Sequence, residues 1–242
     1  MLCQQVVDHL LAAHPDRFAF IDYTPIRRVT VGANGARLAA PAGVVTASRV
    51  VLCTNGFADH VIENESGAAI PIKRQHRVRG TVGVMAGFFE SEDCAPAAIS
   101  YAMSPLIGPG QAYFYVTRRP FERNGRTGTL VCVDGPDERL DRLTDYQPTS
   151  AFPKRHREAI NAFVRATVET ERAEVAFDYA WHGVMAYSES KLRVIASEPR
   201  NPVLLHNLGC NGVGSLPSIY GGDRVTRFLR AKAVEPSVLE PS

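Results

Sequence analysis

The chain has 242 residues, 45% hydrophobic and 21% charged, enough to form the core of one large domain or two smaller ones. Its 27 basic and 25 acidic side chains leave a net charge of +2, which favours neither nucleic acid nor an anionic membrane as a partner. The five cysteines lack C-x-x-C spacing, which predicts reduced thiols without a zinc site or disulfide framework. We expect a cytoplasmic protein, because no apolar run reaches the roughly 20 residues of a membrane span and no signal peptide is visible.

The first third predicts a short helix and then a meander of short strands. Leu2, Val6, Leu10 and Leu11 recur at helical spacing before Pro15, which ends the helix. Apolar, β-rich runs separated by glycine turns follow at 18–21, 26–31, 36–40, 44–46 and 49–53.

The rest of the sequence predicts an antiparallel sheet, a helix and a return to short strands. Strands with aromatic content are expected at 78–85, 111–117 and 127–133, and a helix at about 153–170. Further strands are expected at 175–180, 192–196 and 203–207, then a helix at about 215–232 and a frayed tail. The predicted class is mixed α/β (α+β).

Two segments combine an apolar strand with a turn that a ligand can approach. The strand at 49–53 ends at Thr54, Asn55 and Gly56, although a buried strand leading into an ordinary turn has the same pattern. The strand at 203–207 leads into glycines at 209, 212 and 214 and then a helix, whose amino terminus can hold negative charge. The structural alternative is a glycine turn with Ser215 as the helix N-cap.

A third segment runs from Trp181 to Tyr187 and on to a short strand at 192–195. Taken alone, Trp181 is typical of a core aromatic residue, and His182 of a hydrogen-bonded or solvent-facing one.

Taken in order, four segments resemble the D-amino-acid oxidase and glycine oxidase superfamily of FAD-dependent oxidoreductases. They are residues 24–29, the strand end at 53–56, Trp181-x-Gly183 and the glycine loop with Pro217, Ser218 and Gly221-Gly222. The resemblance implies a Rossmann-like FAD-binding domain interleaved with a substrate domain on a mixed, largely antiparallel sheet. FAD-binding segments are then expected at 1–70 and 176–232, the substrate domain at 71–175 and a flexible tail at 233–242.

The resemblance also implies which residues bind the cofactor FAD and a small-molecule substrate. Ile26 would lie near the adenine, and Thr54, Asn55 and Gly56 near the diphosphate. The flavin ring would face Gly209, Cys210, Asn211, Gly212, Val213, Gly214 and Ser215, and the substrate would face Tyr113, Tyr115, Arg118 and Met185. No side chain is needed as an acid or base, because the flavin accepts hydride while backbone amides at 211–215 stabilise the reduced ring. A Cβ at Gly212 is expected to crowd the ring.

Two departures from the family pattern affect the expected activity. The G-x-G-x-x-G loop is absent from the sequence, so we expect a truncated chain or one half of a split enzyme, which alone binds FAD poorly and is inactive. Met185 stands where amino-acid-oxidising members carry an arginine for the substrate carboxylate. Arg118, Arg79 or Arg193 could replace it, although each is more typical of a surface arginine.

Two other functions compete with an oxidoreductase formed by this chain. One is a non-catalytic or split subunit that completes an FAD site with a chain carrying the G-x-G-x-x-G segment. The other is a cysteine hydrolase or transferase with Cys210 as nucleophile and His206 or His182 as base. Metal binding by isolated histidines is set aside, because they show no ligand spacing.

Overall fold

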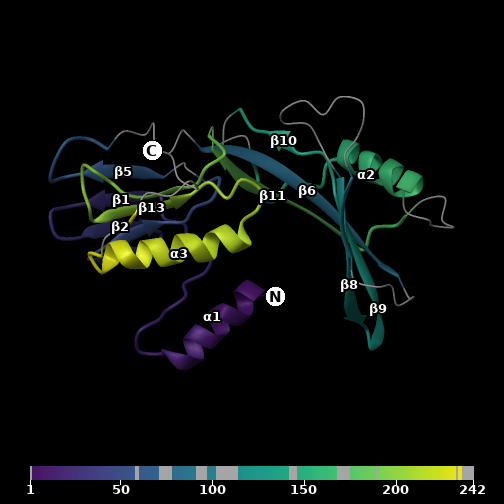
Figure 1. The fold of residues 1–242 in the computed structure, drawn as a ribbon, viewed down its shortest axis with the longest axis horizontal. Helices are drawn as coiled ribbons and strands as arrows, with labels where there is room; N and C mark the ends of the chain where they lie inside the picture. Colours follow the sequence, from purple (N-terminus) through teal and green to yellow (C-terminus); the bar gives the residue numbers. More distant parts are fainter. Residues whose placement is uncertain are drawn as a thin grey trace. The chain divides into compact units, whose positions relative to one another are not determined.

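The computed structural model describes residues 2–57, 60–70, 78–90, 97–101, 114–141, 146–167, 175–188, 190–232 and 234–235. The fold is mixed α/β, as predicted, and divides into two compact units (Figure 1). Unit 1 comprises residues 1–50, 60–70 and 198–204, and unit 2 comprises 51–59, 71–197 and 205–242. Tyr113 and most of the predicted tail lie outside the described residues. The division into FAD-binding and substrate domains stays a prediction.

Unit 1 contains helix α1 (Leu2–Ala13) and a four-stranded sheet in the order β3-β2-β1-β5. The predicted helix and three predicted strands are confirmed as α1, β1 (Arg28–Val31), β2 (Ala36–Ala40) and β3 (Gly43–Ala47). These strands form an antiparallel meander, and β5 (Val61–Asn64), which was not predicted, pairs parallel to β1. The strand predicted at 18–21 was wrong: Phe20 and Ile21 are exposed in an irregular segment, so strand propensity was not matched by burial.

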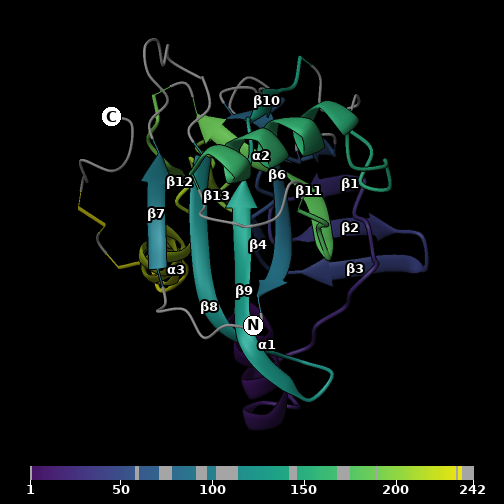
Figure 2. The same cartoon turned by 90° about the vertical axis from the view of Figure 1, so that its right-hand side faces the viewer.

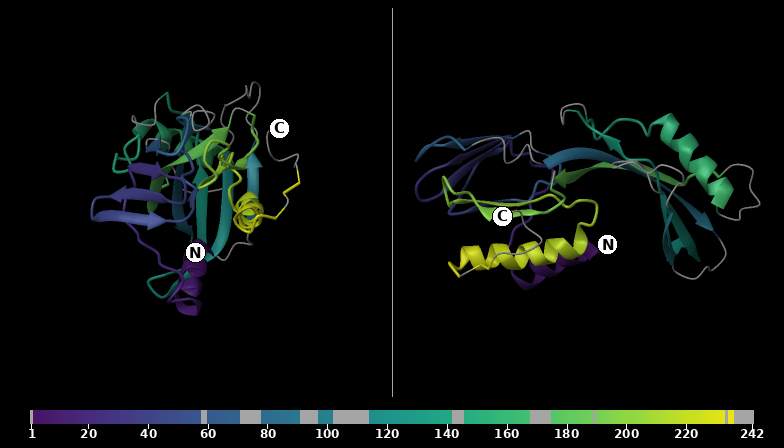
Figure 3. Two further views of the ribbon diagram at one scale, coloured as in Figure 1. Left: turned by 90° about the vertical axis from the view of Figure 1, so that its left-hand side faces the viewer. Right: turned by 45° about the horizontal axis from the view of Figure 1, so that its top comes forward.

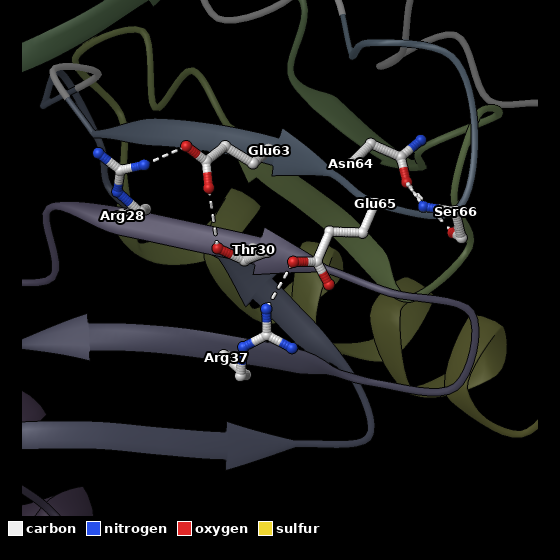
Figure 4. Close-up of polar contacts among 7 residues, drawn as sticks. All are labelled: Arg28, Thr30, Arg37, Glu63, Asn64, Glu65 and Ser66. Atoms are coloured by element: carbon white, nitrogen blue, oxygen red, sulfur yellow. Dashed lines mark hydrogen bonds and ion pairs between the residues drawn. The ribbon is translucent and has the colours of Figure 1, made fainter.

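Charged side chains reinforce the parallel pairing of β1 and β5 (Figure 4). Arg28 forms an ion pair with Glu63, and the Thr30 hydroxyl donates to the same carboxylate over 3.2 Å. Arg37 of the neighbouring strand pairs with Glu65 at 2.6 Å. Because these ion pairs are largely exposed, they select the register more than they stabilise the fold.

The hairpin segment 198–204 belongs to unit 1 through Asn201, which is buried. Its amide nitrogen lies 3.1 Å from the Gly32 carbonyl oxygen, and 3.0 Å from both Asn64 Oδ1 and Ser66 Oγ. One side chain therefore connects segments that are far apart in the sequence.

Unit 2 is built on an antiparallel sheet in the order β10-β6-β9-β8-β7, with β11 on the second edge of β6. Its strands are β6 (Val78–Glu90), β7 (Ala97–Tyr101), β8 (Phe114–Arg123), β9 (Arg126–Asp134), β10 (Glu138–Arg139) and β11 (Tyr179–Ser188). The views in Figures 1 and 3 show the long β6 strand curving along this sheet. The strands predicted at 78–85 and 127–133 are confirmed in β6 and β9, and the described part of the 111–117 strand is in β8.

Helix α2 (Lys154–Thr167) lies across one face of this sheet (Figure 2), which confirms the helix predicted at 153–170 as far as the described residues extend. The core consists of apolar residues on alternate positions of three strands, packed against one stripe of α2: Val84, Ala86, Phe88, Val116, Val131, Val133, Ile160, Phe163 and Val164. The Phe114 ring stacks on that of Phe163 with centroids 4.2 Å apart. Because α2 covers this face of the sheet, the opposite face is the one left available to a ligand.

The predictions missed how β11 and the short edge strands form. β11 begins at Tyr179, so the strand expected at 175–180 is mostly irregular, and the Trp181–Tyr187 segment is strand throughout. β7 and β10 were not predicted; β10 has only two residues and depends on pairing with β6 for its existence.

The remaining sheet has the order β12-β13-β4 and is flanked by α3 (Ser215–Leu229), which runs alongside β13 in Figure 1. β12 (Val194–Ser197), β13 (Leu204–Leu208) and β4 (Val50–Leu52) confirm the three predicted strands to within two residues at either end. None of the described helices is long and apolar enough to cross a bilayer.

A β-bulge separates β9 from β10 along the edge of β6. Asp134 pairs with Met85 and Glu138 with Val82, so three residues of one chain segment face only two of β6. Asp134 is 9% exposed, and burial together with the nearby charge of Asp137 raises the pKa of its carboxyl group to about 7. Burial also raises the pKa of Asp137, whose Oδ1 atom is buried without a hydrogen-bond partner.

The raised pKa predicts how stability depends on pH. The folded state holds the Asp134 proton more tightly than the unfolded state, so the free energy of unfolding should fall as pH rises from about 4 to about 7. Asp134→Asn should remove this contribution and stabilise the protein at pH 8 by on the order of 2 kcal/mol. Denaturant titration across this pH range measures the effect. Asp141→Asn, at an exposed site, is the control; an unchanged slope in Asp134→Asn would contradict the prediction.

Candidate functional site

Two turns that follow β4 and β13 come together in unit 2. The first contains Thr54, Asn55 and Gly56, and the second begins at Gly209 and Cys210. The Cys210 thiol donates a hydrogen bond to Asn55 Oδ1 over 3.2 Å. The structure therefore brings together two segments that the sequence had singled out separately.

The side chain of Asn55 pairs with the backbone of β11. Its amide nitrogen donates to the Val184 carbonyl oxygen and its Oδ1 accepts from the Ala186 N–H, each over 2.9 Å. The residue adopts a left-handed conformation with φ of 50°, which asparagine tolerates better than most residues. The side-chain amide thus acts as a strand-like neighbour for β11.

Glycine is required at position 56 because the turn lies very close to β11. A Cβ at this position would lie 2.3 Å from Val184 Cγ1 and 3.0 Å from the Met185 carbonyl oxygen. No side chain fits there without a shift of β11 backbone, so the Asn-Gly pair is explained first by packing.

Asn211 anchors the second turn to the end of β11. Its Oδ1 accepts from the Ser188 N–H over 2.8 Å, while its backbone N–H donates to the Ala186 carbonyl oxygen over 2.8 Å. Gly212 follows with φ of +78°, and a Cβ there would lie 2.6 Å from the Tyr187 hydroxyl oxygen. The turn and Tyr187 therefore already require glycine at position 212, and the predicted crowding of a flavin ring by a Cβ there stays a prediction.

The start of α3 differs from both sequence interpretations. Gly214, not Ser215, is the N-cap, and no side chain caps the helix. The amides of Asn211 and Val213 are already bonded to Ala186 and Cys210, so the predicted amide set at 211–215 is too broad. Within the described part of the chain, the amides of Gly212, Gly214 and Ser215 have no hydrogen-bond partner.

This helix start is open to solvent. Val213 is 67% exposed and Leu216 is 79% exposed, and Ser215 is also exposed. Unused amides at a helix amino terminus carry a partial positive charge of about +0.5. The turn can therefore bind an apolar group that carries or develops negative charge, which a closed cap could not.

The predicted substrate residues are distributed over both faces of the large sheet. Strand alternation and the register through β6, β9 and β8 place Met185 and Tyr115 on the face opposite α2. Arg118 lies on the α2 face, where its Nε atom is buried without a partner, so it is separated from Met185 and Tyr115. Tyr113 lies outside the described residues.

Met185 lies beside the acidic bulge. The position that a Cβ would take at Gly83 is 2.7 Å from Met185 Cε and 3.5 Å from Asp137 Oδ1. Asp134 shares this face through its pairing with Met85. A Cβ at Gly183, directly opposite Gly83, would meet no atom within 4 Å. Open space, a flexible apolar side chain and carboxyl groups are therefore adjacent on this face, a combination that sequence spacing did not reveal.

The contacts of Cys210 and His182 do not support a nucleophile and base. The Cys210 thiol is hydrogen-bonded to Asn55, and the His182 ring nitrogens lie 3.1 Å from the Tyr146 hydroxyl and 2.9 Å from the Ser150 carbonyl oxygen. The hydrolase hypothesis thus gains nothing from the structure.

Comparison with known proteins agrees with the resemblance seen in the sequence. The family model described as FAD dependent oxidoreductase matches residues 3–227. The chain belongs to this family. The family's cofactor is FAD, and the family match spans both candidate turns. No curated protein sequence matches the chain.

Solved structures show the same fold at low sequence identity. Glycine oxidase from Geobacillus kaustophilus is 17% identical with a TM-score of 0.50, covering 91% of this chain and 51% of its own. NikD, an unusual amino acid oxidase essential for nikkomycin biosynthesis, is 12% identical with a TM-score of 0.60, covering 90% and 54%. Amadoriase II, a fructosamine oxidase from Aspergillus fumigatus, is 15% identical with a TM-score of 0.55, covering 86% and 48%. The chain spans about half the length of these structures.

The double role of Asn55 predicts a large loss of stability on its replacement. Asn55→Ala should lower the free energy of unfolding by about 2–4 kcal/mol, because it leaves a β11 carbonyl and N–H without partners. Asn124→Ala is the matched control: Asn124 is also left-handed, with φ of 51°, but sits in an exposed hairpin turn. Equal losses in the two variants, measured by chemical denaturation, would show that only backbone strain is involved.

Proposed function

We propose that this chain forms the flavin-facing and substrate-facing part of an oxidoreductase that oxidises a small amine, amino acid or related substrate. The observation that carries the proposal is the open, uncapped start of α3, with unused amides at Gly212, Gly214 and Ser215. The family match makes FAD the group expected there.

The residues present fit this cofactor. Thr54 Oγ1 is buried without a partner near the end of β4, as expected of a donor reserved for a ligand oxygen. Asn55 and Gly56 hold this turn, and Gly209, Cys210 and Asn211 hold the turn that leads to α3. Ile26 lies in unit 1, and its place near the adenine rests on the resemblance alone.

The chemistry divides between cofactor and chain. Bound FAD would accept hydride from a substrate C–H bond and return electrons to oxygen or another acceptor. The chain's amides at the start of α3 would stabilise negative charge on the pyrimidine side of the ring. No side chain of the described site needs to act as acid or base for this step.

The substrate-facing side favours an amine over a free amino acid. Met185 cannot bind a carboxylate, and Asp134 and Asp137 on the same face offer it no positive charge. An amino group could donate to the unpartnered Asp137 Oδ1 atom. Tyr115 shares this face, and Arg118 lies on the other.

A partner-completed site is the second candidate, and exposed apolar side chains favour it. Helix α1 has no buried residue, with Leu2 and Val6 exposed, and α3 exposes Leu216 and Ile219. A chain carrying a G-x-G-x-x-G segment could cover such surfaces. A flavin-containing complex with a second chain supports this candidate, and a flavin-containing monomer, identified by light scattering, contradicts it.

Gly214 provides the sharpest test of the proposed flavin contact. A Cβ there would meet only Cys210 Cβ, at 3.6 Å, so Gly214→Val should fold while covering the unused amides. We expect FAD affinity, measured by flavin fluorescence, to fall about tenfold or more. Gly222→Val, in open space on the same helix, is the matched control and should bind like the original chain. Equal affinities for all three proteins would contradict the proposal. Gly212 is unsuitable because its replacement would clash with Tyr187.

A further inference from the structure

Arg193, which precedes β12, is a buried cation that pairs with no carboxylate in the described part of the chain. The residue is only 8% exposed. Nη2 donates to Asn207 Oδ1 over 2.8 Å, while Nε and Nη1 are buried without hydrogen-bond partners. Burying a guanidinium group in this way costs several kcal/mol unless another group pairs with it.

The described surroundings of Arg193 supply thiols and amides rather than carboxylates. The groups whose negative charge would act on Arg193 are the thiols of Cys53 and Cys210. Burial raises the pKa of the Cys53 thiol more than Arg193 lowers it, so this thiol stays neutral near pH 7 and cannot serve as the counterion. Arginine remains charged even when burial lowers its pKa, as it does here. Within the described residues, no carboxylate therefore compensates the positive charge of Arg193.

The fold fixes this guanidinium at the strand-end turns. Asn207 holds Nη2, and Asn207 is itself backed by α3, because a Cβ at Gly221 would lie 2.6 Å from its Oδ1 atom. Arg193 Cα lies 3.8 Å from the position of a Cβ at Gly209. Thr54 Oγ1 is a further buried donor without a partner among the described residues, and its neighbour Cys53 lies close enough to Arg193 to act on it electrostatically. Arg193 and Thr54 therefore adjoin the two outer strands of the β12-β13-β4 sheet, and strand ends are the usual place for ligands in such folds.

We propose that Arg193 is an oxyanion-binding residue of this site, which donates from Nε and Nη1 to ligand oxygens with help from the Thr54 hydroxyl. A diphosphate of a nucleotide cofactor fits best, since the proposed function places it near Thr54; a substrate carboxylate offers the same chemistry. The inference rests on the proposed function only for the source of the anion. The need for an anion follows from the uncompensated charge.

The test measures thermal unfolding of the full chain with and without anions. Inorganic pyrophosphate should raise the Tm of the original chain by several degrees, through binding to the folded state alone. Arg193→Met should unfold at the same temperature or higher without anion, because an unpaired buried charge is removed, and its pyrophosphate affinity should fall about tenfold or more. Arg193→Lys should keep part of the response. Arg227→Met, which removes an exposed arginine paired with Asp223, is the matched control and should respond like the original chain.

Acetate and ADP distinguish the sources of the oxyanion. A response to pyrophosphate and ADP that depends on Arg193 supports a diphosphate, and one to acetate alone supports a carboxylate. An undiminished pyrophosphate response in Arg193→Met overturns the proposal. If that variant does not fold, calorimetric titration of the original chain decides, and absence of saturable pyrophosphate or acetate binding overturns it. Because no flavin is used, failure of flavin binding and failure of this inference are separate results.

Discussion

The pairing of the Asn55 side chain with β11 is the contact on which the candidate site depends. One amide group satisfies the Val184 carbonyl oxygen and the Ala186 N–H and also accepts from the Cys210 thiol. It therefore joins the end of β4, the edge of the large sheet and the turn before α3 in a single network. Because each partner is a backbone group or a short side chain, the positions of the two turns are fixed within unit 2. The unused amides at the start of α3 owe their placement to this network.

The buried polar atoms without partners fall into two regions, one with unused hydrogen-bond donors and one with an unused acceptor. Thr54 and Arg193 leave buried donors without partners at the strand ends, whereas Asp137 leaves a buried acceptor on the large sheet. Buried polar groups are normally hydrogen-bonded. A buried group without a partner indicates either that a ligand binds there or that the fold loses stability at that place. An oxyanion at the first region and an amine at the second would satisfy both. This correspondence is the physical basis of our proposal that cofactor and substrate bind at different parts of unit 2.

The family model matches residues 3–227, and the structures of glycine oxidase, NikD and amadoriase II share the fold of this chain at low sequence identity. Fold likeness at this level does not carry a substrate with it. The local chemistry is more informative: on the side that we propose to face the substrate, Met185 and the acidic bulge supply no positive charge for a carboxylate. Specificity for an amine would then come from hydrogen bonds to carboxyl oxygens and from the lack of a cation for an acid.

Sequence patterns were enough to predict the mixed α/β class, the three helices, most strands and the two turns at 54–56 and 209–214. Those features depend on local periodicity, glycine and asparagine preferences, and strand propensity, all of which are short-range. It could not determine β5, β7 or β10, since these strands exist by pairing with partners distant in the chain. The tertiary structure showed that Val184 and Tyr187 leave no room for a side chain at Gly56 and Gly212. It also showed that Gly214 occupies the N-cap position of α3 without a side-chain cap, and that Arg118 and Met185 lie on opposite faces of the large sheet. It also revealed Asp137 beside Met185 and the unpaired charge of Arg193, because burial and the identity of a missing partner are properties of packing, which residue order alone does not encode.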